Sequence, residues 1–195
     1  MDLKLNKGTT LVELIIVLAI LTLILGTVVG IFVSIMQKQQ RFSSEDDIST
    51  QSNYVMDHIS MLIQGAKQDN SGSCLGASYA GYNYLLSHFD ATPGFYQGIK
   101  FISKDNDCYE IFLDTDGVLK ETKGSNPAQN IFSSKYNIKY ARFVINADKT
   151  IQGSSAIDST QPRVTFNLDI ATKGSQNPVE KIIQTTASQR NLNTP

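Results

Sequence analysis

Few side chains in this sequence are of the types that carry out acid–base or nucleophilic chemistry. The chain of 195 residues has two histidines, of which His58 directly follows Asp57 and His88 stands between a serine and a phenylalanine. We interpret both as surface or hydrogen-bonded histidines and not as the base of a nucleophile. The sequence also contains no phosphate-binding loop, dinucleotide fingerprint or HExxH motif. We therefore predict no catalytic residue, no cofactor and a protein that is not an enzyme.

Four aspartates could supply the oxygen ligands that Ca²⁺ prefers, namely Asp105, Asp107, Asp114 and Asp116. Their spacing departs from the EF-hand pattern after the first glycine. The run from Asp114 to Gly117 is typical of a hairpin turn, in which aspartate bonds to nearby backbone. We favour turn chemistry and predict no metal site, and whether Ca²⁺ binds stays open.

The chain has two cysteines, Cys74 and Cys108. Two thiols without CxxC spacing form neither a zinc site nor a redox motif. In an exported protein an even count favours a disulfide, which would join the segment after the N-terminal helix to a strand. Two buried free thiols are the alternative.

Length and charge exclude several classes of protein. A chain of this length forms one ordinary domain, or a small domain with an appendage, and not two large catalytic domains. Lysine and arginine number 17 against 18 aspartates and glutamates, for a net charge of −1. Without a basic excess, we expect no nucleic-acid partner.

A long apolar run near the N-terminus predicts a transmembrane helix. Residues 14–36 carry no charge and would reach about 35 Å as a helix, enough to cross about 30 Å of hydrocarbon. The run is longer than the apolar region of a secretory signal peptide. Lys4 and Lys7 precede it, which places the N-terminus in the cytoplasm and the rest outside. Glu13 directly precedes the run, and a carboxylate in such a place usually has a partner.

The residues around Glu13 resemble a known signature. The run KGTTLVELIIVLAI, residues 7–20, resembles the N-terminal signature of type IV pilins and pseudopilins. In that family prepilin peptidase cuts a basic leader after a glycine, the new N-terminus is methylated, and the fifth mature residue is glutamate. The resemblance implies a leader of residues 1–8, cleavage between Gly8 and Thr9, and Glu13 as that glutamate. The family usually has phenylalanine at the position of Thr9, so methylation of Thr9 stays open.

The resemblance also implies how the subunit assembles. The methylated amine of one chain would pair with Glu13 of its neighbour in low dielectric, where the attraction is far stronger than in water. A wrong axial register would leave both charges unpaired, so the pair selects register. The implied partners are other pilin or pseudopilin subunits, prepilin peptidase, the inner-membrane assembly platform and the lipid bilayer.

Helical periodicity continues past the membrane span. One apolar stripe recurs among polar residues, formed by Ile48, Val55, Ile59, Leu62 and Ile63. The simplest interpretation is one helix over residues 9–66, about 87 Å long. Gly26 and Gly30 within it permit close helix packing or local unwinding during assembly, or reflect membrane-helix composition alone. Residues 43–47 fit either a capping box that breaks the helix or, as we favour, a solvated part of a continuous helix.

From about residue 83 the apolar period becomes two, which indicates strands. We expect an α+β fold in which one antiparallel sheet packs on the amphipathic end of the helix, with residues 67–195 as an extracytoplasmic β-rich head. Residues 124–130 and 153–161 are interpreted as loops, and the aromatic-rich residues 79–96 as core and loop packing more than a contact patch. The strands are predicted at residues 98–103, 108–113, 118–122, 138–145, 163–170 and 179–187.

These features together predict a structural, non-enzymatic subunit of a type IV pilus-like or type II secretion filament. The size of the head and residues 183–191 resemble the larger J- or W-type minor subunits. The protein would be a single-pass membrane protein that later enters a pilus or pseudopilus at the cell surface or in the periplasm. The alternative is a membrane-anchored extracytoplasmic binding module whose helix is only a tether.

Overall fold

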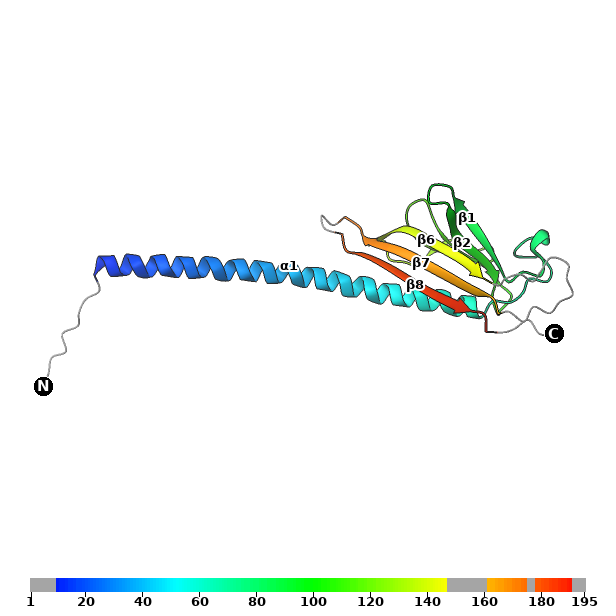
Figure 1. Cartoon of the computed structure of the whole chain (residues 1–195), viewed down its shortest axis with the longest axis horizontal. Coiled ribbons are helices and arrows are strands. Elements are labelled where there is room, and N and C mark those ends of the chain that lie inside the picture. Colours follow the sequence, from blue (N-terminus) through cyan, green and yellow to red (C-terminus); the bar gives the residue numbers. More distant parts are fainter. Residues whose placement is uncertain (1–9, 147–160, 175–177, 191–195) are drawn as a thin grey trace. The chain divides into compact units, whose positions relative to one another are not determined.

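The structure is a computed structural model that describes residues 10–146, 161–174 and 178–190. Helix α1 runs from Leu11 to Gln64 (Figure 1). The chain divides into two compact units within this helix, between Ser44 and Glu45. After α1, the described residues form the short 3₁₀ helix η1 (Ala77–Tyr79) and the strands β1 (Tyr84–Asp90), β2 (Phe95–Ile102), β3 (Cys108–Leu113), β4 (Leu119–Lys123), β5 (Gln129–Asn130), β6 (Tyr136–Asn146), β7 (Arg163–Thr172) and β8 (Glu180–Ser188).

The predicted α+β class is confirmed, and α1 is close to its predicted bounds. Thr9, the predicted first residue of the helix, lies outside the described residues. Residues 43–47 are helical throughout, so the alternative of a break at a capping box is wrong. The hydroxyls of Ser44 and Ser49 donate to the carbonyl oxygens of Gln40 and Glu45, at 3.0 and 2.8 Å. Both serine hydroxyls thus bond to carbonyl oxygens four residues earlier in the same helix, as they do in a continuous helix.

The C-terminal part of α1 buries the predicted apolar stripe in the second unit. Ile48, Val55, Ile59 and Ile63 are each no more than 1% exposed. They belong to a core that draws on both sheets, including Phe101 and Ile111 from the first and Phe143 and Phe166 from the second. This part of α1 is therefore stabilised by apolar burial and not by propensity alone.

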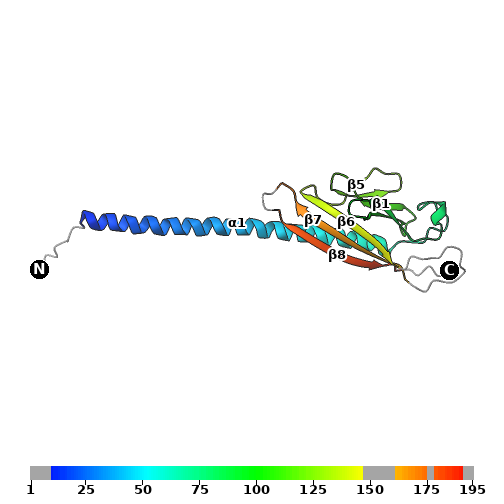
Figure 2. The ribbon, with the colours of Figure 1, turned by 45° about the horizontal axis from the view of Figure 1, so that its top comes forward.

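The strands form two antiparallel sheets, whereas the sequence predicted one. The first has the order β1-β2-β3-β4-β5 and the second the order β6-β7-β8. Strands β6 to β8 run along the C-terminal part of α1 in both views (Figure 1, Figure 2). The second sheet has a bulge between Ile138 and Tyr140.

Side chains, more than backbone, join the two sheets. Phe95 of β2 and Tyr140 of β6 meet edge to face at 5.9 Å, and the Arg142 guanidinium lies 5.6 Å from the Phe95 ring centre. The Ile138 amide donates to the carbonyl oxygen of Gly117, in the turn between β3 and β4. β2 pairs with β1 on one edge and with β3 on the other, so β6 belongs to a separate sheet. The alternation of apolar residues cannot reveal which strands pair.

The predicted strands are present, with ends shifted by a few residues. The segment 108–113 is β3 with the predicted bounds, and the predicted turn from Asp114 to Gly117 connects β3 to β4, with Gly117 at a φ of 74°. Two strands were missed. β1 lies in the aromatic-rich stretch interpreted as core and loop packing, and β5 comprises the last two residues of a segment predicted to be a loop.

An ion pair links α1 to the first sheet. His58 Nε2 lies 2.6 Å from Glu121 Oε2 of β4, and the Tyr54 ring stacks on the imidazole. The hydrogen bond to Glu121 raises the pKa of His58 above its ordinary value of 6.5 and outweighs partial burial, which lowers it. His58 is therefore a hydrogen-bonded histidine, as the sequence predicted.

The raised pKa of His58 gives a pH-dependent prediction. The pair stabilises the head fully below pH 6.5, the ordinary value for an unfolded histidine, and this contribution is lost as pH rises through the higher folded-state value. We expect Glu121→Gln to lower the free energy of unfolding by about 1 kcal/mol or less at pH 6 and by less at pH 8, because the pair is partly exposed. Denaturant unfolding at both pH values measures this difference.

Glu180→Gln is the matched control, because Glu180 pairs with Lys139 at 2.6 Å and this pair contains no histidine. Its effect should be equal at pH 6 and pH 8. Equal effects of Glu121→Gln at the two pH values would contradict the role assigned to the His58 pair.

Candidate functional site

The N-terminal part of α1 is an apolar surface that nothing in the described chain covers. Its most apolar 18-residue window has a mean hydropathy of 3.0, and none of that window is buried. Leu23 is 71% exposed and Phe32 is 62% exposed. Soluble monomers rarely expose apolar patches beyond a few hundred Å². The helix is long and apolar enough to cross a bilayer as a single-pass anchor.

Thr10 and Glu13 form the N-terminal end of this helix. The Glu13 backbone amide donates to Thr10 Oγ1 at 3.4 Å, and the Leu14 amide donates to the Thr10 carbonyl oxygen at 3.2 Å. Thr10 is therefore the N-cap, and Glu13 occupies the third helical position, as in a capping box. The exposed Glu13 carboxylate lies in the first turn, where the helix dipole favours negative charge. Sequence reasoning missed this cap, although the Thr-x-x-Glu spacing is its signal.

The predicted processing residues Gly8 and Thr9 lie outside the described residues, as does the leader of residues 1–8. The structure therefore does not bring Glu13 together with an N-terminal amine, and their pairing stays a prediction.

Gly26 and Gly30 expose backbone on the apolar helix. A Cβ atom added at either glycine would meet nothing within 4 Å. The helix is regular at both positions. Nearby, Thr22 and Thr27 bond to the carbonyl oxygens of Ala19 and Ile24, at 2.9 and 2.7 Å. The polar groups of this segment are thus satisfied within the helix, and the two glycines leave room for close approach by another helix.

No protein-family model matches the chain, and neither a curated protein nor a solved structure matches it.

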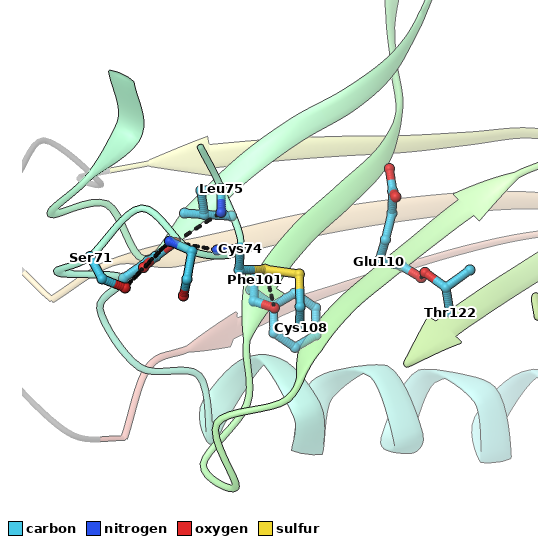
Figure 3. Close-up of a disulfide and its surroundings, with 9 residues drawn as sticks. Ser71, Cys74, Leu75, Phe101, Cys108, Glu110 and Thr122 are labelled. Atoms are coloured by element: carbon cyan, nitrogen blue, oxygen red, sulfur yellow. Dashed lines mark hydrogen bonds between the residues drawn. A yellow bond between two sulfur atoms is a disulfide. The ribbon is translucent and has the colours of Figure 1, made fainter. Parts of the chain in front are cut away.

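The expected disulfide between Cys74 and Cys108 is present in the head (Figure 3). It ties the segment after α1 to the first residue of β3, across a sequence separation of 34. Leu75 and Ile102 pack with the two cysteines in a small second core.

A buried carboxylate organises the segment that carries Cys74. Asp69 is 1% exposed and accepts backbone amides of Ser73, Cys74 and Leu75 at 2.8 to 3.1 Å, together with the Ser71 hydroxyl at 3.2 Å. Burial alone would raise the pKa of Asp69, but these donors outweigh it and hold the pKa below its ordinary value. The Asp69 carboxylate thus fixes the loop in the conformation that places Cys74 beside Cys108.

A buried amide pair fastens the last described strand to the end of α1. Asn83 and Gln189 are fully buried and bond to each other, and Gln189 Nε2 donates to the Ala66 carbonyl oxygen at 2.9 Å. The Arg190 amide donates to the Gln64 carbonyl oxygen. Sequence reasoning missed this pair, as it missed Asp69, because apolar periodicity carries no signal for buried polar residues.

Three of the four aspartates considered for Ca²⁺ contact lysines. Asp114 and Asp116 both contact Lys120 Nζ, the second at 3.0 Å, and Asp107 lies 3.1 Å from Lys123 Nζ. Within the described ranges, no three His, Cys, Asp or Glu side chains are arranged to hold a metal ion.

The disulfide gives a stability prediction. A Cys74→Ser, Cys108→Ser double variant should lose about 3 to 4 kcal/mol of unfolding free energy, the chain-entropy value for a loop of this length. Denaturant unfolding of the oxidised protein and the variant measures the loss. Two freely alkylated thiols in the exported protein would contradict the bond.

Replacing Asp69 by Asn should lower the free energy of unfolding by about 2 kcal/mol at pH 7, because the amide cannot accept the same set of charge-assisted bonds. The lowered pKa means that the Asp69 contribution is present above pH 3.8 and is lost as pH falls through the folded-state value. The variant should therefore lose less stability than the parent between pH 5 and pH 3. Asp105→Asn, in an exposed loop, is the control, and an equal loss in Asp69→Asn and the parent would contradict this role.

Proposed function

We propose that this chain is a structural, non-enzymatic subunit of a type IV pilus-like or type II secretion filament. Prepilin peptidase cuts it between Gly8 and Thr9, and it assembles through helix packing and a pair between Glu13 and an N-terminal amine. The observation that carries the proposal is the uncovered, charge-free surface of α1, residues 14–36, with an acidic residue, Glu13, at its N-terminal end. Glu13 and the start of this surface lie within the signature at residues 7–20.

The apolar surface of α1 is suited both to a lipid bilayer and to a filament interior. Before assembly the bilayer covers residues 14–36, and after assembly the same residues pack against the helices of neighbouring subunits. Gly26 and Gly30 are the positions where a neighbouring helix approaches most closely, because they present backbone without side chains.

Glu13 contributes more to the axial register in which subunits assemble than to the strength of their association. The Glu13 backbone amide donates to Thr10 Oγ1, and the carboxylate lies in the first turn of α1. In a filament interior that carboxylate needs a cation. The N-terminal amine of a neighbouring subunit supplies it at one axial register, and every other register leaves two buried charges unpaired.

The disulfide of the head is an argument that the head is exported before assembly. Its disulfide persists in an oxidising compartment, such as the periplasm or the cell exterior. The head is therefore extracytoplasmic, and the leader is on the cytoplasmic side with the peptidase and the assembly platform. The J- or W-type minor subunit is the subtype that the size of the head favours.

The test combines processing with assembly. We expect Glu13→Gln to leave leader cleavage intact and to reduce incorporation into filaments by roughly 100-fold, since a buried charge without its partner costs about 3 kcal/mol. Mass spectrometry of the native N-terminus and immunoblots of sheared filaments measure the two steps. Asp57→Asn, which removes one exposed charge elsewhere on α1, is the matched control and should incorporate normally.

Two outcomes would overturn the proposal. Normal incorporation of Glu13→Gln would remove the charge pair. A mature protein that begins at Met1 would instead favour the tethered binding module.

A further inference from the structure

The head contains a cleft where its two sheets meet. The cleft has a volume of about 560 Å³ and is lined by the end of β1, the β3–β4 turn and the start of β6. The bond from the Ile138 amide to the Gly117 carbonyl oxygen, at 2.9 Å, joins the turn to β6. Gly117 allows the close approach, because a Cβ atom there would lie 2.0 Å from Asn137 Oδ1. The cleft is thus formed by strand and turn residues, and its volume is within the range of small-molecule sites.

Polar side chains that both donate and accept hydrogen bonds line this cleft. Gln97 Nε2 donates to Asp90 Oδ2 at 2.6 Å, which fixes the orientation of the Gln97 amide. Gln97 Oε1 is buried and has no hydrogen-bond partner among the described residues. Asn137 adds an exposed amide to the lining. Because Gln97 Oε1 is buried out of reach of solvent, the groups of this set that a ligand can contact are the Asp90 carboxylate and the Asn137 amide.

Aromatic rings lie beside these polar groups. Phe89 lines the cleft, is 59% exposed and meets Tyr96 edge to face at 5.0 Å. His88, also in the lining, has a φ of 53° and stacks flat on Phe112 at 4.3 Å. A backbone held in this sparsely populated region is typical of functional sites. The exposed Phe89 ring offers an apolar face next to hydrogen-bonding side chains.

The charges of the lining disfavour anionic ligands. Asp90, Asp114 and Asp116 contribute three carboxylates. The lining lysine, Lys139, is already paired with Glu180 at 2.6 Å. Lys120 bridges Asp114 and Asp116, which occupies those carboxylates and disfavours capture of a free cation.

We propose that this cleft binds a neutral saccharide, whose hydroxyls bond to Asp90 and Asn137 and whose apolar ring face packs on Phe89. Hydroxyls donate to carboxylate and amide oxygens and accept from amide nitrogens, so a saccharide can bond to both Asp90 and Asn137. The apolar C–H face of a pyranose suits an aromatic ring. Binding needs only the head, and so it goes beyond filament assembly and stands independently of it.

The experiment uses the full chain purified in a detergent without a sugar headgroup, because maltoside detergents would compete. The probe is an array of neutral oligosaccharides of glucose, galactose, mannose and N-acetylhexosamines, with sialylated and sulfated glycans and lysine-rich peptides as further arms. Calorimetric titration then gives Kd for the saccharide bound. We expect a neutral saccharide to bind, and Asp90→Asn and Asn137→Ala each to weaken it by about tenfold or more.

Asp105→Asn, outside the cleft, is the matched control and should change Kd less than about twofold. An intact disulfide and an unchanged thermal midpoint show that each variant is folded. The proposal is overturned if no neutral saccharide binds, if anionic glycans or lysine-rich peptides bind instead, or if both cleft variants bind as the parent does. The titration measures saccharide binding by monomers in detergent, so it does not depend on filament assembly. A negative binding result would therefore not contradict the assembly proposal, and a negative assembly result would not contradict the binding proposal.

Discussion

A helix that is apolar on every side must be covered, and this constraint decides what the rest of the chain can do. From Leu14 to Met36 no side chain of α1 carries a charge, and the most apolar window has no buried residue. The helix is therefore compatible with a single-pass membrane anchor. Glu13 is the exception at the N-terminal end of this surface. Its backbone amide donates to Thr10 Oγ1, and its carboxylate lies in the first turn, where the helix dipole favours negative charge.

The same helix has a different role in the head. From Ile48 onward only one stripe is buried, and that stripe contributes to a core shared by both sheets. Polar contacts then fix the position of the helix on them: Asp47 accepts the hydroxyl of Tyr136 at 2.8 Å, and the Tyr84 hydroxyl donates to the Ile63 carbonyl oxygen at 2.7 Å. Burial, together with the bond to Asp47, raises the pKa of Tyr136 to about 12, so this tyrosine remains a donor at physiological pH. Apolar burial stabilises the unit, and the polar bonds select one arrangement of it.

The elements with a clear period were predictable from the sequence, and the contacts between elements were not. The stripe from Ile48 to Ile63 predicted the buried face of α1, and the alternation from residue 163 to 170 predicted most of β7. The division into two sheets depends on which strands pair, with β2 between β1 and β3 and with β6 beside β7, and no local pattern encodes this. Asp69, Asn83 and Gln189 are buried polar residues whose roles depend on backbone groups distant in sequence. Gly8 and Thr9 rest on resemblance alone.

The link between Cys74 and Cys108 also has a mechanical consequence. A load transmitted along α1 that peeled the head open from Gly65 onward would reach Cys74 after a few residues and then pass through the covalent bond to β3. The separation of 34 residues between the two cysteines corresponds to about 110 Å of extended chain, all of which the bond shields from stretching. η1, β1 and β2 lie within that span, so tension would bypass them and pull directly on the centre of the five-stranded sheet.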